Sequence, residues 1–459
     1  MRLVRVLAVL GLATVGALIP LRAQDSSQNS PAQEVQSPTY AGPAVLTRGQ
    51  APAAMNTPQI DFRPFVEVTG IYDTGLAAVS VNDQGQLANA AAAGVEIAGG
   101  VSGLHSWENT SLGLDYRGAF RDYNRQTYYD GTDQSLRLAL THRLARHYTF
   151  NLRESGGLFS RDFGLVGLPS AIPYDPNSSG YIPQTDFFDN RTIYLDTAAD
   201  LTIQTSTRLS FDLGGDGLLA RRRSTALYGV TGAIARGDVQ YRITRRTTIG
   251  AAYSYTWFGF TRVLGDTYLH TIVGSYSVRL SRSTEFTAFA GALRSETRFV
   301  QTVPLDPVVA AVLGVTEGNV IVHSIGYSPT FSARLSRVVR TGVFFLGGSR
   351  TMTPGNGLFL TSKVTSAYGG YTYTGLRRWS FNVTASLDRG TSVANITGQY
   401  NDYGGQLQAS RQVSRAVHAI FGFSARRYSS PSFAGYNRPI YDARIGVGFS
   451  PGDLPLRIW

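Results

Sequence analysis

The chain has 459 residues, with 50 Gly, 25 Tyr, 23 Phe, no Cys and a formal net charge of +11. Without cysteine it can form no disulfide framework, cysteine zinc finger, thiol nucleophile or lipoprotein anchor. Hydrophobic residues make up 43%, which is too few for a helical membrane bundle. Charged residues make up only 16%, against a usual share of about 25%. This Gly- and Tyr-rich, charge-poor composition favours β structure on a large scale.

The positive charge comes almost entirely from arginine. Lys363 is the single lysine, which leaves 42 − 1 = 41 Arg. These arginines are dispersed along the chain, and no helix-turn-helix, zinc or RNP-type motif accompanies them. Nucleic-acid binding needs a basic stripe on a recognition element, so we expect no nucleic-acid partner.

Residues 1–23 have the pattern of a signal peptide. Arg2 and Arg5 precede an apolar run over residues 6–19, and the small residue Ala23 stands at the expected cleavage site. The run is shorter than the about 20 residues of a spanning helix. We therefore expect export through the Sec pathway.

Residues 24–58 are rich in Ser, Pro, Gln and Ala and show no hydrophobic periodicity. Such a segment cannot bury enough apolar surface to offset its chain entropy. We interpret it as a disordered periplasmic N-terminal segment. The alternative is a short plug inserted into a barrel.

From residue 59 onward, apolar and polar residues alternate. In residues 111–121, for example, Leu114 and Tyr116 alternate with Asp115 and Arg117. This period of two is typical of strands with one apolar face. A soluble sandwich also alternates, but 401 residues (59–459) exceed the usual size of a single soluble core. A membrane barrel with apolar residues outside and polar residues inside fits better.

A short turn rich in Ser, Thr and Arg recurs along this region, mostly every 37 to 39 residues. Its eight copies join sixteen strands, and one more strand stands at each end. The total is eighteen, an even number as in bacterial single-chain barrels. We predict an all-β, transmembrane, antiparallel up-and-down β-barrel of about 18 strands over residues 59–459, with 16 strands as second choice.

Short turns face the periplasm in such barrels and long loops face outward. The sequence predicts long loops at residues 74–92, 161–190 and 301–318. The apolar stretch from Pro304 to Val315 would either fold into the lumen as a constriction or rest on lipid at the rim. The arginines of the short turns would lie near inner-leaflet phospholipids, or simply keep the hairpins soluble.

The polar faces of the strands supply the candidate functional residues. They are Asp115, Arg117, Arg121, Arg137, Arg143, Arg153, Asp196, Asp200, Asp212, Arg242, Arg279, Arg334, Asp388, Asp442 and Arg444. One interpretation is that they pair across strands and brace the wall. The other is a polar conduit whose Arg excess favours anions, since rings of Arg select anionic cargo.

Three of the short turns resemble turns of a known group of proteins. They are Leu280-Ser-Arg-Ser-Thr284, Leu335-Ser-Arg-Val338 and Ile243-Thr-Arg-Arg-Thr247. The chain resembles the large β-barrel porins of Gram-negative and acidobacterial outer membranes, including barrels associated with exopolysaccharide loci. This resemblance covers about residues 60–459 and implies outer-membrane lipids and lipopolysaccharide as surroundings.

The last strand resembles the signal recognised by the barrel-assembly machinery. Its candidate residues are Tyr441, Ala443, Ile445, Val447 and Phe449, with Trp459 at the chain end. It departs from the usual pattern because ten residues follow Phe449, including two prolines.

The sequence favours an outer-membrane channel for passive passage of small polar or anionic solutes. Alternatives are an exopolysaccharide-export barrel, a plugged or non-conducting structural barrel, and an outer-membrane hydrolase. The six histidines show no metal-binding spacing and no nucleophile elbow, so we predict no enzyme, catalytic residue, metal or cofactor.

Overall fold

The computed structural model describes residues 60–81, 87–124, 130–159, 192–223, 227–355, 357, 359–373, 378–393, 398–431 and 437–451. The expected signal peptide, the segment 24–58, the loop 161–190 and Trp459 lie outside this part of the chain. Within it, the chain forms eighteen strands and one short helix.

The first nine strands, in chain order, are β1 (Ile60–Val81), β2 (Leu87–Ser106), β3 (Thr110–Tyr123), β4 (Gly131–Ala145), β5 (Tyr148–Phe159), β6 (Thr192–Gln204), β7 (Leu209–Arg222), β8 (Val230–Arg242) and β9 (Thr247–Phe260). The others, with the helix, are β10 (Gly265–Arg279), β11 (Thr284–Pro304), α1 (Pro307–Leu313), β12 (Glu317–Val339), β13 (Gly342–Thr353), β14 (Ser362–Tyr373), β15 (Trp379–Ser392), β16 (Gln399–Gln412), β17 (Val417–Ser429) and β18 (Arg438–Phe449).

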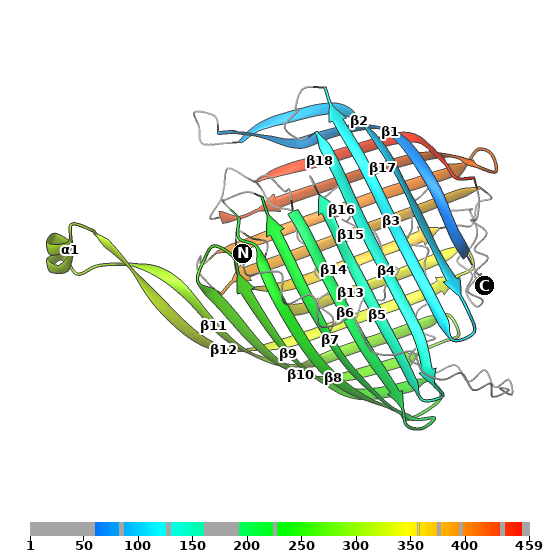
Figure 1. Ribbon diagram of the computed structural model, residues 1–459, viewed down its shortest axis with the longest axis horizontal. Helices are drawn as coiled ribbons and strands as arrows, with labels where there is room; N and C mark the ends of the chain where they lie inside the picture. Colours follow the sequence, from blue (N-terminus) through cyan, green and yellow to red (C-terminus); the bar gives the residue numbers. More distant parts are fainter. Residues whose placement is uncertain are drawn as a thin grey trace, which may run out of the picture. The chain divides into compact units, whose positions relative to one another are not determined.

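The strands form one closed sheet in which each pairs antiparallel with its neighbours in sequence (Figure 1). Closure is made by β1, which pairs with β2 on one side and with β18 on the other, for example Val66 with Phe449. A closed sheet leaves no edge strand along its wall. The predicted up-and-down barrel of eighteen strands is therefore confirmed.

The alternation in sequence becomes two different faces of the wall. Val66, Ile97 and Ile193 are about half exposed on the outer face, whereas the adjacent Glu67 and Glu96 are buried. Successive side chains of a strand point to opposite faces, so the apolar residues form the outer surface and the charged residues line the interior. This arrangement is the reverse of a soluble protein and suits lipid outside.

The short turns share one local geometry. The hydroxyl of Ser206 accepts hydrogen bonds from the amides of Arg208 (3.2 Å) and Leu209 (3.0 Å), and the hydroxyl of Ser414 accepts from Val417 (3.1 Å). Ser and Thr hydroxyls commonly satisfy turn amides in this way. The recurring Ser or Thr of the sequence repeat is therefore a turn-forming residue.

The predicted loop 74–92 is wrong. Here β1 and β2 continue as a paired extension, through Asp73 with Ala92 and on to Val81 with Leu87, with register shifts on the way. The segment is rich in Ala and shows little alternation. Backbone pairing within the hairpin holds it as strand, because ladder hydrogen bonds do not need an alternating side-chain pattern.

Of the two interpretations of residues 304–315, a constriction of the lumen is wrong. The pairing of β11 with β12 runs out to Pro304 with Glu317, whereas that of β12 with β13 starts only at Phe331 with Arg350. The outer part of this hairpin extends beyond the neighbouring strands and carries α1 at its tip (Figure 1). The side chain of Asp306 caps α1 by accepting from the Val308 amide (2.9 Å).

Candidate functional site in the barrel interior

The fifteen predicted lumen-lining residues lie on β3 to β8, β10, β12, β15 and β18. In each strand their positions alternate with those of exposed apolar residues such as Tyr116, Leu213 and Phe331. Alternation places them on the inner face of the barrel. Which of them contacts a passing solute remains a prediction.

Charged groups on β18 and β1 to β4 form one continuous ion network. Arg121 contacts Glu96 (2.5 Å) and Asp133 (2.6 Å), and Arg117 contacts Glu96 (2.6 Å) and Glu67 (3.5 Å). Glu96 is 1% exposed, so its charge is removed from water and needs these partners.

Arg444 joins the same network from β18. It contacts Asp442 (3.0 Å) and Glu96 (3.5 Å), and thereby links the last strand to the second. We call this set the closure network; its members are Glu67, Glu96, Arg117, Arg121, Asp133, Asp442 and Arg444. With three arginines and four carboxylates, its formal charge is 3 − 4 = −1.

A second group spans β5 to β8. Arg236 pairs with Asp200 and with Asp216 (2.7 Å), and Arg153 pairs with Asp200 (3.1 Å). On β16 and β17, Arg426 pairs with Asp402. Each of these groups crosses at least one strand boundary, so it ties neighbouring strands together at the side-chain level.

The other candidates have varied surroundings. Asp115 lies opposite Arg137 in the β3–β4 register, and Arg279 lies opposite Glu285 in that of β10–β11. Ser366 donates to Asp388 (2.5 Å).

Arg334 lies over the ring of Phe345, 5.6 Å from its centroid, while Arg242 donates to the carbonyl of Thr207. Asp196 is buried, Asp212 lies opposite Asp238, and Arg143 is exposed beside a short turn.

Six of the fifteen candidates therefore take part in ion pairs. Arg117, Arg121, Arg153, Asp200 and Arg444 pair across strands, and Asp442 pairs with Arg444 within β18. An arginine whose charge is balanced by a carboxylate attracts a passing anion less strongly than the anion-selecting interpretation requires. The bracing interpretation accounts for these six residues. The anion-selecting interpretation rests on the others, above all Arg137 and Arg334.

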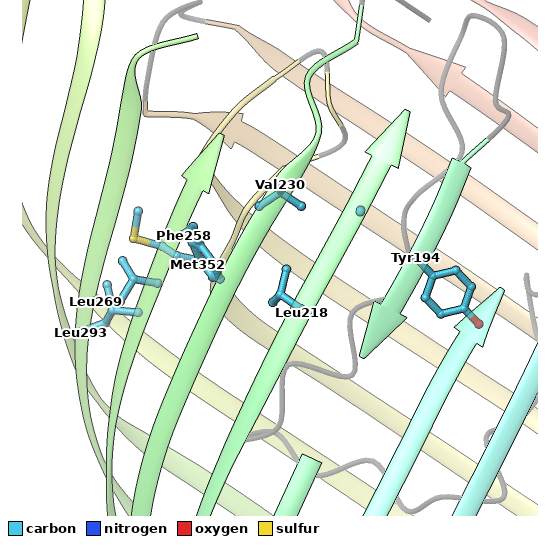
Figure 2. Close-up of a cluster of buried hydrophobic side chains, with 8 residues drawn as sticks. Tyr194, Leu218, Val230, Phe258, Leu269, Leu293 and Met352 are labelled. Atoms are coloured by element: carbon cyan, nitrogen blue, oxygen red, sulfur yellow. The ribbon is translucent and has the colours of Figure 1, made fainter. Parts of the chain in front are cut away.

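A cluster of apolar side chains lies near the long-loop ends of β6 to β11 and of β13. Figure 2 shows Tyr194, Leu218, Val230, Phe258, Leu269, Leu293 and Met352 gathered there. With Ala220 they form a cluster in which every member is at most 6% exposed. This apolar cluster lines one sector of the wall and carries no charged side chain.

The connection between β13 and β14 lies beside this cluster in its described residues, 354, 355, 357 and 359–361; we call these residues the crossing loop. Phe359 and Leu360 are fully buried. Phe359 stacks on Tyr400 of β16, with ring centroids 5.5 Å apart. The hydroxyls of Thr361 and Thr267 of β10 lie 2.6 Å apart.

The crossing loop also reaches the connection that follows β7. The carbonyl of Gly357 accepts from the Tyr228 amide (2.9 Å). Gly357 has a φ of +90°, and an added Cβ would lie 2.7 Å from the guanidinium carbon of Arg222. Glycine is required here both for its backbone conformation and for this close approach.

These contacts bridge the outer mouth of the barrel. In a closed ring of eighteen strands, β7 and β16 are 16 − 7 = 9 strands apart and therefore lie on opposite sides. The crossing loop contacts residues at the outer ends of both. It thus crosses the interior at its long-loop end and narrows the cross-section available to a solute.

The sequence analysis did not predict the crossing loop, because this connection is shorter than the three segments predicted as long loops. A usable signal was present in Thr353-Pro-Gly-Asn-Gly357, a run of turn residues followed directly by Leu358, Phe359 and Leu360. Three consecutive apolar residues in a connection between strands suggest that the connection is packed against something.

On the outer face of β18, Tyr441, Ile445, Val447 and Phe449 are all 45% or more exposed, and Ala443 shares their parity. The strand pairs with β1 and β17. This is the apolar face expected of an assembly signal; recognition by the assembly machinery remains a prediction.

Among the described residues, no three His, Asp or Glu side chains are grouped so that they could hold a metal ion. No helix in that part of the chain is long and apolar enough to cross a membrane. His323 contacts Glu296 (2.9 Å) on the outer face of β11 and β12, away from the interior.

A scan against protein-family models finds no match for the chain, and a search of curated proteins finds none either. Solved structures with a similar arrangement include OccK2 (OpdF) of Pseudomonas aeruginosa in complex with glucuronate. It is 13% identical, with a TM-score of 0.41, covering 86% of this chain and 99% of that one.

Two further similar structures are a BenF-like porin from Pseudomonas fluorescens Pf-5 and OccAB1 of Acinetobacter baumannii. The first is 11% identical with a TM-score of 0.41, covering 85% of this chain and 98% of that one. The second is 10% identical with a TM-score of 0.40, covering 88% and 100%. At such scores the likeness carries no argument about the site, which must be judged from its own geometry.

Proposed function

We propose that this protein is an outer-membrane channel through which small polar or anionic solutes pass passively. The observation that carries the proposal is the closed eighteen-strand wall with apolar residues on its outer face and charged residues on its inner face. Such a wall places water inside and lipid outside. Barrels of about 16–18 strands are wide enough to leave an aqueous channel.

The route for a solute would run beside the crossing loop, along the inner wall that carries the charged groups. Charged and hydroxyl side chains can replace part of the hydration shell of a polar solute. Arg137 and Arg334, whose charge is not consumed by the ion pairs described above, would favour anions along this route. The crossing loop would set the upper size of the solute.

Single-channel current in a planar bilayer tests this proposal. The refolded mature chain is expected to give steady open steps under a salt gradient, with a reversal potential that favours chloride. Replacing chloride by gluconate should reduce the current if the crossing loop limits solute size. A protein shown to be folded that stays silent at all voltages would overturn the channel proposal.

A second candidate, a gated or plugged barrel, is favoured by one observation. The crossing loop is fully buried at Phe359 and Leu360 and is held from both sides of the mouth. In that case conduction appears only after the loop is released. A Phe359→Ala variant that conducts, beside a silent wild type, would identify this function; silence of both would leave a non-conducting structural barrel.

The proposal includes the route by which the chain reaches the membrane. Residues 1–23 would be removed on Sec export, and β18 would be read by the assembly machinery. The mass of the protein purified from outer membranes should correspond to a chain beginning at Gln24. An exposed Met1 on that protein would count against the signal peptide.

A further inference from the structure

Most of the short turns contain arginine and no acidic residue. Residues 144–147, 205–208, 243–246, 280–283, 340–341 and 413–416 contain at least one Arg each and no Asp or Glu. The exception is the turn at 107–109, which contains Glu108. Each of these turns joins an even-numbered strand to the odd-numbered strand that follows it, so all of them lie at the same end of the barrel. A ring of positive charge therefore surrounds that end.

Four of these turns repeat a finer pattern, in which an exposed apolar residue is followed two positions later by an exposed Arg. The pairs are Leu144 with Arg146, Ile243 with Arg245, Leu280 with Arg282, and Val413 with Arg415. The four apolar residues are 48% to 58% exposed. They continue the outer-face parity of Leu136, Tyr241, Tyr276 and Tyr403, so they point toward lipid.

The turn backbone fixes the arginines relative to these apolar residues. In three of the four turns a hydroxyl stands between them and accepts from an amide further on: Thr244 from Arg246 (3.1 Å), Ser281 from Ser283 (3.2 Å) and Ser414 from Val417 (3.1 Å). The fourth turn has Ala145 instead. A rigid turn loses little entropy when its Arg binds a ligand.

We propose that these four turns bind the phosphate groups of anionic phospholipid headgroups in the adjacent leaflet. The apolar residue would contact the acyl chains, and the Arg two residues later would reach the headgroup, where planar guanidinium groups pair well with phosphate. The four turns lie between β4 and β5, β8 and β9, β10 and β11, and β16 and β17, so the sites are distributed around the barrel.

The exposed apolar residues point to lipid rather than to a soluble anion as the ligand. A purely electrostatic site for a soluble polymer needs no apolar neighbour on the lipid-facing side. The inference rests on the membrane location given under the proposed function. It goes beyond that function because it concerns the outer face and not the conducted solute.

The test compares two variants of the mature chain in detergent micelles. The turn variant replaces Arg146, Arg245, Arg282 and Arg415 by Gln. The control variant replaces Arg221, Arg223, Arg389 and Arg427 by Gln; these four exposed arginines lie at or near the long-loop end of their strands. Both variants lose four positive charges, so a general effect of net charge would be equal in the two.

Binding of dioleoylphosphatidylglycerol is measured by native mass spectrometry, with dioleoylglycerol and inorganic phosphate as further probes. Each Arg near an anionic surface contributes about fivefold in affinity. We expect the turn variant to lose tenfold or more in apparent phosphatidylglycerol affinity, while the control variant stays within about twofold of wild type. Dioleoylglycerol should bind more weakly, and inorganic phosphate should not displace the lipid.

Equal losses in both variants would overturn the proposal, as would unchanged binding in the turn variant. Displacement by inorganic phosphate would assign the turns to soluble anions instead. If the fourfold variant does not fold, Arg282→Gln with Arg415→Gln is compared with Arg221→Gln with Arg427→Gln. Single-channel current of the same proteins separates the two proposals, since a conducting barrel without lipid preference would refute only this one.

Discussion

Two regions of the inner face differ in the side chains that fill them. One is the closure network on β18 and β1 to β4, and the other is the apolar cluster at the outer ends of β6 to β11 and β13. Both fill the inner face of the wall. The first does so with seven charged side chains, the second with eight uncharged ones. The apolar cluster is buried throughout, whereas in the closure network the carboxylates and Arg121 are buried and Arg117 and Arg444 are partly exposed.

The contrast shows how local environment decides what an inward-facing position can do. Buried charges must be paired, because an unpaired one costs several kcal/mol, so the closure network is rigid but sensitive to the loss of any member. The apolar cluster is held by burial alone and tolerates conservative changes. A solute that passes beside the crossing loop would therefore meet fixed charges on one side and a packed apolar loop on the other.

The largest effect is expected for Glu96→Gln. Glu96 has contacts with three arginines, so its replacement leaves buried positive charge uncompensated and should cost about 3–5 kcal/mol of unfolding free energy. Urea unfolding in lipid vesicles measures the change. Glu108→Gln, on an exposed turn, is the control and should shift stability by less than about 0.5 kcal/mol. A loss below 1 kcal/mol at Glu96 would contradict the closure network.

Leu293→Ala should cost about 3 kcal/mol, because it removes a buried side chain and leaves a cavity in the apolar cluster. The same unfolding experiment applies, with Leu313→Ala on the exposed face of α1 as the control. Equal effects of the two substitutions would show that the cluster is not packed as described.

Gly357→Ala should destabilise the crossing loop by about 1–3 kcal/mol, through its positive φ and its contact with Arg222. We expect larger or more frequent open steps in single-channel recordings, since the loop would leave the mouth part of the time. Gly217→Ala, where an added Cβ meets no atom within 4 Å, should leave the current unchanged. Identical recordings from both variants would count against a role of the loop in limiting conduction.

At Asp402 and Arg426, an ion pair on the inner face can be replaced by an apolar pair. Asp402→Leu alone should be destabilising by about 1–3 kcal/mol, because it removes the ion pair of Arg426 with Asp402. The double replacement by Leu should recover most of that loss, since an apolar pair can substitute for a buried ion pair. If the double variant is less stable than Asp402→Leu alone, an apolar pair cannot substitute for this ion pair, and that would contradict the prediction.

The smallest effect concerns selectivity. Charge reversal to Glu at Arg137 and at Arg334 should shift the reversal potential toward cations. Arg117 is left unchanged in this test, because it pairs with the buried Glu96 and its reversal would destabilise the closure network. Reversal potentials under a salt gradient measure this shift. An unchanged reversal potential in both variants would show that these arginines do not determine selectivity.

Much of this protein follows from its sequence. The alternation of Leu114, Asp115, Tyr116 and Arg117, together with the recurring short turn, is enough to predict the fold and the number of strands. These features are local, because strand parity and turn chemistry depend on neighbouring residues alone. The same reasoning failed where a paired hairpin continued without alternation, as it does beyond Asp73.

The tertiary structure alone decided which charges meet and which connection crosses the mouth. Glu96 and Arg444 are 348 residues apart and become neighbours only when β18 closes on β1, while Thr267 and Thr361 meet only across the interior. Such contacts depend on the stagger and closure of the whole sheet, which no local pattern encodes. For that reason the sequence alone identified an inner face rich in arginine, and only the closed barrel revealed that much of it is already neutralised.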